Sequence, residues 1–112
     1  MNYFTESYLE CAMWSSSDGE VETLDNLDMD SDTMDNLILK AEKFWNENEK
    51  LIHAFMEAEG VDEGQVGHSL WLSQNGHGAG FFDFGVIGDQ LHEIARNNPT
   101  NLYIGDDGKV HC

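Results

Sequence analysis

The most constraining feature of this sequence is an apolar stripe that repeats every three or four residues between Met34 and Phe55. Such spacing places apolar side chains on one face of a helix. It predicts a long amphipathic helix over residues 32–58, about 40 Å long at about 1.5 Å per residue. Asn48 interrupts the stripe and marks where a kink or exposed turn would fall. The stripe consists of Met34, Leu37, Ile38, Ala41, Phe44, Trp45, Leu51, Ile52 and Phe55.

Two shorter helices and an acidic loop are predicted around this element. Thr5 is a helix-capping residue, and Tyr8 and Cys11 follow it at helical spacing. Residues 15–33 are polar with few apolar side chains, which indicates a loop. Residues 86–97 have apolar side chains on one helical face and are soon followed by a proline, which cannot continue a helix.

The remaining segments predict strands. The stretch "HSLWLS" alternates apolar and polar residues, and "FFDF" would pair with it across a glycine-rich loop. The closing stretch "NLYIGDDGKVH" predicts a second hairpin, so that residues 69–112 form a hairpin, a helix and a hairpin. The expected fold is a single α+β domain over residues 1–112. In it, two or three helices pack on one face of a small, mostly antiparallel sheet of three to four strands.

The charge of the chain restricts its partners. Twenty-two acidic residues against five lysines and arginines give a formal net charge of −17 at pH 7. Ten acids lie between Met1 and Leu39 and seven between Leu51 and Ala95, and neither stretch contains a lysine or arginine. Such a surface repels nucleic acids and anionic membranes and attracts basic proteins. We expect no direct contact with nucleic acid or membrane.

The first residues lack the basic and apolar regions of a secretory signal, and two cysteines make no disulfide framework. No apolar run approaches the roughly 20 residues that span a bilayer. These features predict a soluble, cytoplasmic protein.

No pattern of side chains predicts an enzyme, a cofactor or a dedicated metal site. The loop "NGHGAG" lacks the Lys-Ser/Thr ending of a phosphate-binding loop, and its histidine has no positioned partner. The loop residues Asn75, His77 and Asp83 are therefore expected to serve only as contacts. Hairpins could bring several potential ligands together, but their spacing matches no zinc motif. These potential ligands are His77, Asp83, His92, His111 and Cys112.

The acidic residues themselves are the main candidates for function. Carboxylates fixed on a rigid helix and loop can imitate a nucleic-acid backbone, which has about one negative charge per 1.7 Å of duplex axis. The alternative is that the acids provide solubility or adaptation to high salt. High-salt adaptation would spread acids evenly, whereas these thicken over residues 18–35. The predicted partner-binding residues are Asp18, Glu20, Glu22, Asp25, Asp28, Asp30, Asp32 and Asp35.

Three stretches resemble a family of small, acidic, uncharacterised bacteriophage proteins. They are "YLECAMWSSSD" (8–18), "LWLSQNGHGAGFFD" (70–83) and "LYIGDDGKV" (102–110), and their order and spacing match that family. The family commonly has a basic residue where this chain has Gln74 and Phe84, which weakens any role of the loop in gripping an anion. The resemblance implies no enzymatic activity or cofactor, but it implies a phage product acting inside a bacterium.

These observations together predict an acidic phage inhibitor that binds the basic nucleic-acid groove of a host nucleic-acid-processing or defence complex. The class includes anti-restriction and anti-CRISPR proteins, and this part of the prediction is an analogy. One alternative is a metal-dependent enzyme or metal-binding protein centred on His77 and Asp83, with His92 as a further ligand. Another is an oligomeric scaffold, such as a homodimer, in which exposed Trp14 and Phe81 pair copies and the acids provide solubility.

Overall fold

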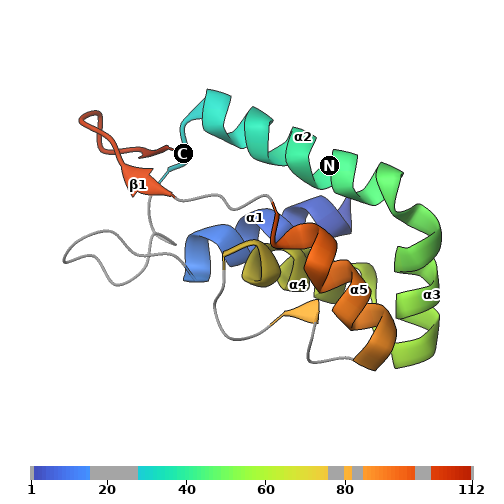
Figure 1. Ribbon diagram of the computed structural model, residues 1–112. Coiled ribbons are helices and arrows are strands. Elements are labelled where there is room, and N and C mark those ends of the chain that lie inside the picture. Colours follow the sequence, from blue (N-terminus) through green and yellow to red (C-terminus); the bar gives the residue numbers. More distant parts are fainter. Residues whose placement is uncertain (1, 16–27, 76–79, 82–84, 98–101, 112) are drawn as a thin grey trace.

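The computed structural model describes residues 2–15, 28–75, 80–81, 85–97 and 102–111, and this part of the chain is mainly helical. Five helices form its body, and a short antiparallel ribbon lies beside the start of the second helix (Figure 1). The elements are α1 (Tyr3–Ser15), α2 (Ser31–Glu47), α3 (Glu49–Glu59), α4 (Glu63–Asn75), α5 (Gly85–Ala95), β1 (Tyr103–Ile104) and β2 (Val110–His111).

Helices α1 and α4 lie side by side at the centre of the body (Figure 1). Gly67 of α4 faces the backbone of α1, and a Cβ added there would stand 2.8 Å from the amide nitrogen of Tyr8. Because glycine has no Cβ, the two backbones can approach this closely. Inside the interface, the Tyr8 hydroxyl donates a hydrogen bond of 2.6 Å to the side-chain carbonyl oxygen of Gln74. A close backbone contact and a buried polar pair therefore define this interface.

The predicted 32–58 helix is present, but it is broken at Asn48 into α2 and α3. The backbone N–H of Asn48 donates to the carbonyl oxygens of Phe44 and Trp45, and its side-chain amide donates to that of Phe44. These bonds end α2, and α3 turns away from it (Figure 1). The break falls at the residue where the sequence placed a kink or exposed turn. The expected unbroken length of 40 Å is wrong, since the 17 residues of α2 extend about 25 Å.

The core lies between these helices and is apolar. Phe81 is fully buried and stands against Phe44 and Phe55, with ring centroids 5.8 and 5.4 Å apart. Its backbone N–H donates to the hydroxyl of Ser73, which ties the chain after α4 back to that helix. The prediction that Phe81 is exposed and pairs copies of the chain is therefore wrong.

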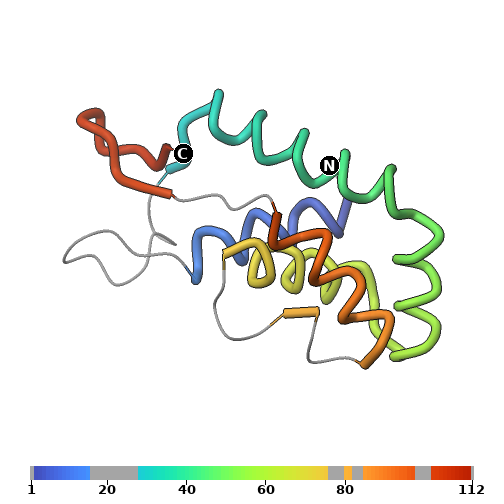
Figure 2. The backbone as a smooth tube through the Cα atoms, viewed as in Figure 1, coloured from blue at the N-terminus to red at the C-terminus, as the bar shows by residue number. Residues whose placement is uncertain are grey.

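The strands β1 and β2 form the second predicted hairpin, with Tyr103 opposite His111 and Ile104 opposite Val110. Val110 also joins the segment before α2: its N–H donates to the carbonyl oxygen of Asp28, and its carbonyl oxygen accepts from the N–H of Asp30. Figure 2 shows the C-terminal segment returning to the start of α2. The side chain of Val110 is fully buried there, so the hairpin is docked on the body.

The predicted fold class is wrong. Among the described residues the only sheet has two strands of two residues each, in place of three to four strands covered by helices. The stretch "HSLWLS" belongs to α4, which is buried on most of its circumference and so shows no clear helical stripe in the sequence. Asp62 begins this helix, because its carboxylate accepts from the backbone N–H of Gln65 at 3.0 Å.

Other predicted elements are confirmed, namely the first helix, the helix predicted over residues 86–97 and the Asp-Asp-Gly hairpin. The capping role predicted for Thr5 is wrong: α1 begins at Tyr3, and the backbone N–H of Thr5 donates to Oδ1 of Asn2 at 2.9 Å. Of the predicted acidic loop 15–33, residues 16–27 lie outside the described residues, and α2 already begins at Ser31. No helix in the described part of the chain has both the length and the apolarity needed to cross a membrane.

Candidate partner-binding site

The segment before α2 is held on two sides, which gives its carboxylates fixed positions. Asp30 is the N-cap of α2, and its Oδ2 accepts from the backbone N–H of Thr33 at 3.2 Å. The backbone of Asp28 and Asp30 pairs with Val110 through two hydrogen bonds of 2.8 Å. An N-cap carboxylate also lies at the positive end of the helix dipole, which stabilises its negative charge.

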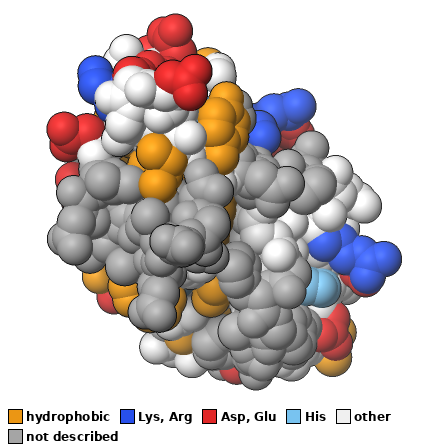
Figure 3. Space-filling view, turned by 90° about the vertical axis from the view of Figure 1, so that its left-hand side faces the viewer, with side chains coloured by type: hydrophobic (Ala, Val, Ile, Leu, Met, Phe, Trp, Pro, Cys, Tyr) orange, Lys and Arg blue, Asp and Glu red, His pale blue; other side chains and the backbone are white. Residues whose placement is uncertain are grey.

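Acidic side chains from two parts of the chain gather around this segment. Asp28, Asp32 and Asp35 are exposed, and the docked hairpin adds Asp106 and Asp107 from its turn. Figure 3, in which the left-hand side of Figure 1 faces the viewer, shows acidic side chains at the top of the molecule. We call this group the acidic end, and it consists of Asp28, Asp30, Asp32, Asp35, Asp106 and Asp107.

His111 lies between two carboxylates of the acidic end. Its Nε2 is 3.0 and 3.2 Å from the two carboxylate oxygens of Asp107, and its Nδ1 is 3.8 Å from Oδ2 of Asp30. The pKa of Asp107 is lowered from its ordinary value, first by the backbone N–H of Lys109 and then by the hydrogen bond to His111. Hydrogen bonds to the ionised form of a carboxylate favour that form. Asp107 is therefore a carboxylate at neutral pH.

The acidic end overlaps the predicted surface and adds residues of the hairpin. Asp35 is the last residue of α2 that belongs to the acidic end, because the lysines Lys40 and Lys43 are exposed further along the helix. Lys43 also pairs with Glu47 at 3.8 Å. Asp18, Glu20, Glu22 and Asp25 lie outside the described residues. The structure thus places four of the eight predicted acids, namely Asp28, Asp30, Asp32 and Asp35, next to two hairpin acids that were not predicted as part of the site.

A second group of exposed acids surrounds the connection between α3 and α4. Glu57 and Glu59 end α3, and Asp62 and Glu63 begin α4. This connection lies at the other end of the molecule from the hairpin (Figure 1). We call these four residues the distal acids, and they provide a comparison for the acidic end.

The predicted loop contacts are only partly described. His77 and Asp83 lie outside the described residues. Asn75 ends α4, where its side-chain amide donates to the carbonyl oxygen of Trp71 at 3.0 Å. His92 lies on α5 and belongs to no cluster of potential metal ligands among the described residues.

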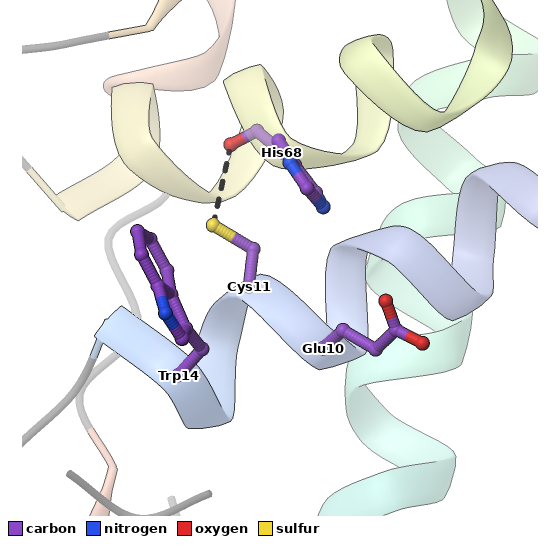
Figure 4. A pocket seen from close by; sticks show the side chains of 4 residues that line it. All are labelled: Glu10, Cys11, Trp14 and His68. Atoms are coloured by element: carbon purple, nitrogen blue, oxygen red, sulfur yellow. Dashed lines mark hydrogen bonds between the residues drawn. The ribbon is translucent and has the colours of Figure 1, made fainter.

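A pocket of about 380 Å³ opens between α1 and α4, lined by Glu10, Cys11, Trp14 and His68 (Figure 4). Burial raises the pKa of the Cys11 thiol to about 11, although the hydrogen bond with the Ser15 hydroxyl lowers that pKa by a smaller amount. The sulfur of Cys11 lies 3.7 Å from the carbonyl oxygen of His68. A protonated thiol is a poor nucleophile, so the pocket does not resemble a cysteine active site. Trp14 is 65% exposed, and an exposed aromatic face suits a cationic side chain, while the carboxylate of Glu10 points away from the Trp14 ring (Figure 4).

Sequence reasoning missed Asp107 and its contact with His111. The Asp-Asp-Gly turn with a histidine four residues after its second aspartate was the available signal, since a tight hairpin can bring such residues together. The contact with Asp30 had no sequence signal, because it depends on pairing between distant segments.

Comparison with protein-family models, with curated proteins and with solved structures finds no match to this chain.

Proposed function

We propose that this protein is an acidic inhibitor that binds the basic nucleic-acid groove of a host nucleic-acid-processing or defence complex in a bacterium. The partner would be a protein or a ribonucleoprotein, and the chain would take the place of the nucleic acid. The phage setting and the anti-restriction or anti-CRISPR type rest on the resemblance described above.

The acidic end is the observation that supports this proposal most. Its carboxylates belong to a capped helix and a docked hairpin, so their positions are held by backbone hydrogen bonds. A basic groove gains most from charges that are already ordered, because less conformational entropy is lost on binding. Complementary charge also speeds association and makes affinity depend on salt.

The pocket between α1 and α4 is a second feature that suits a basic partner. A lysine or arginine side chain could stack on Trp14, which would add an apolar contact to a mainly electrostatic interface. Exposed charge pairs alone contribute little affinity, whereas buried aromatic contacts contribute much of it.

The proposal is tested by capturing host proteins from nuclease-treated bacterial lysate on the immobilised full chain. We expect a nucleic-acid-binding protein that is retained at low salt and displaced by duplex DNA. The matched variants are D28N/D32N/D35N in the acidic end and E57Q/E59Q/E63Q in the distal acids. Loss of capture in the first triple variant only is expected. Capture that duplex DNA does not displace, or that survives D28N/D32N/D35N, would contradict the proposal.

A further inference from the structure

Three potential metal ligands meet where the hairpin docks on the start of α2. Asp30, Asp107 and His111 each offer one ligand atom, and these atoms all lie within 4.8 Å of one another. They come from the N-cap of α2, the hairpin turn and strand β2. This is the only such group in the described part of the chain.

We propose that Asp30, Asp107 and His111 form a binding site for a divalent transition-metal ion of the Zn²⁺ type. An imidazole with two carboxylates is a donor set suited to zinc, whereas Ca²⁺ and Mg²⁺ prefer oxygen ligands alone. This inference goes beyond the proposed function, because it concerns a different ligand and needs no protein partner, although Asp30 and Asp107 also belong to the acidic end.

The distances show which ligand must move for one ion to bind all three. Ligand atoms about 2 Å from a tetrahedral zinc ion are roughly 3.3 Å from one another. Nε2 of His111 already lies 3.0 and 3.2 Å from the Asp107 oxygens, whereas the 3.8 Å contact with Asp30 is made by Nδ1, the other ring nitrogen. One ring nitrogen binds one ion, so the carboxylate of Asp30 or the ring must shift to shorten separations that are now within 4.8 Å. Water would complete the coordination, as in zinc sites with three protein ligands.

The charges fit as well. Two carboxylates and a neutral imidazole carry a charge of −2, which a divalent ion neutralises. In a chain with a net charge of −17, a bound cation also reduces repulsion among neighbouring acids such as Asp28 and Asp106.

The imidazole is held in place by contacts that do not involve the two carboxylates. The ring of His111 stacks on Tyr103, with centroids 5.7 Å apart and planes 21° from parallel. Gly105 lies beneath the ring, and a Cβ added there would stand 2.5 Å from Cδ2 and 2.7 Å from Nε2 of His111. The backbone hydrogen bonds of Val110 with Asp28 and Asp30 hold the backbone next to His111 in place. A site whose ligands are ordered in advance needs less rearrangement on binding.

The chain offers a matched control for the histidine. His53 of α3 is exposed and has one carboxylate, that of Glu49, at 3.6 Å, but it belongs to no group of three potential ligands in the part of the chain that the structure describes. The variant H53Q therefore removes a histidine–carboxylate pair without touching the proposed site.

The experiment is a calorimetric titration of the metal-free full chain with Zn²⁺, and separately with Ca²⁺. We expect saturable zinc binding with one ion at this site, weakened at least about 10-fold in H111Q and in D107N. Binding in H53Q should equal that of the original chain, and Ca²⁺ should bind at least about 10-fold more weakly than Zn²⁺. The variant G105A keeps every ligand but displaces the ring, so it should also weaken zinc binding.

Substitution with Co²⁺ provides a readout that identifies the ligands. We expect visible absorption from cobalt with nitrogen and oxygen ligands, which H111Q abolishes and H53Q keeps. Circular dichroism of each variant verifies that it is folded. Zinc affinity that is equal in the original chain and H111Q, or a thiolate-to-cobalt charge-transfer band, would overturn the assignment. The first result would leave His111 with only an ion-pair role.

Discussion

The α1–α4 interface and the junction between the hairpin and α2 are held together in different ways. In the interface, glycine allows two backbones to touch, and apolar side chains such as Phe4, Leu70 and Trp71 are buried around them. In the junction, two backbone hydrogen bonds join Val110, whose side chain is buried, to a segment that has exposed carboxylates. The interface therefore provides stability, whereas the junction presents charge.

This difference implies different responses to mutation and to solution conditions. Close packing leaves no room for added atoms, and apolar burial does not depend on salt or pH in the way that exposed charge does. Changes in the interface should therefore alter the free energy of unfolding of the whole body. Changes in the junction should mainly alter binding and the local opening of the hairpin.

The largest effect is expected for G67A in the interface. The new Cβ would collide with the backbone of α1, at the carbonyl oxygen of Phe4 and the amide nitrogen of Tyr8. Backbone cannot move aside as a side chain can, so we expect a loss of about 2–3 kcal/mol in the free energy of unfolding, measured by urea denaturation.

The matched control is G64A on the same helix. Its Cβ would meet only the ring of Tyr3, which is 55% exposed and can swing into solvent. We expect a change within about 1 kcal/mol, because the better helix propensity of alanine offsets the displacement of the ring. Equal losses for G67A and G64A would contradict the close backbone contact.

A smaller effect is expected for Y8F, which removes one hydroxyl from the same interface. The hydroxyl donates to Gln74 at 2.6 Å, and both side chains are buried. Without it, a buried carbonyl oxygen loses its donor, so we expect a loss of about 1–2 kcal/mol in urea denaturation. An unchanged midpoint would show that this polar pair does not stabilise the interface.

In the junction, D30A should cost about 1 kcal/mol through loss of the α2 N-cap. Asp35 is an exposed residue inside α2 and is not its N-cap, so D35A serves as the control. We expect D35A to lower the free energy of unfolding less than D30A does. Thermal unfolding of the two variants measures the difference. Equal midpoints for D30A and D35A would contradict the capping role of Asp30.

The smallest effect concerns pH and the hairpin. The pKa of Asp107 is lower in the folded chain than its ordinary value of 3.8. The ionised carboxylate of Asp107 therefore contributes fully to the free energy of unfolding above pH 3.8, and this contribution is lost as the pH falls through the lower pKa of the folded chain. The hydrogen bond from the Lys109 N–H to Asp107, at 3.0 Å, should weaken over the same range.

Amide chemical shifts of Lys109, measured by NMR while the pH is lowered from neutral, report this transition. We expect one titration step below pH 3.8 in the original chain and none at Lys109 in D107N. A step at or above 3.8 would contradict the lowered pKa.

The same contrast explains what could be predicted from the sequence. The apolar stripe of α2 and α3 and the Asp-Asp-Gly turn are local signals, and both elements are present. The start of helix α4 was predicted as a loop and residues 68–73 as a strand, because burial on most sides, with glycines at 64 and 67, removes the polar stripe that marks a helix. Its capping pair, Asp62 and Gln65, was the overlooked signal.

The site was predictable only in part, for the same reason. Asp28, Asp30, Asp32 and Asp35 were found from composition, which requires no knowledge of the fold. The addition of hairpin acids depends on the pairing of Val110 with the segment before α2, and no local pattern encodes pairing between segments so far apart in the chain. The break at Asn48, by contrast, was marked in the sequence by the interruption of the apolar stripe.

The central claim is that the acidic end, and not overall negative charge, binds a basic partner. The direct measurement is the affinity of the captured host protein as a function of salt, from about 0.05 M to about 0.5 M, for D28N/D32N/D35N and E57Q/E59Q/E63Q. Both variants lose three charges, so their net charge is the same. We predict weaker binding and a shallower salt dependence for the first and an almost unchanged curve for the second. Identical curves for the two variants would contradict the claim.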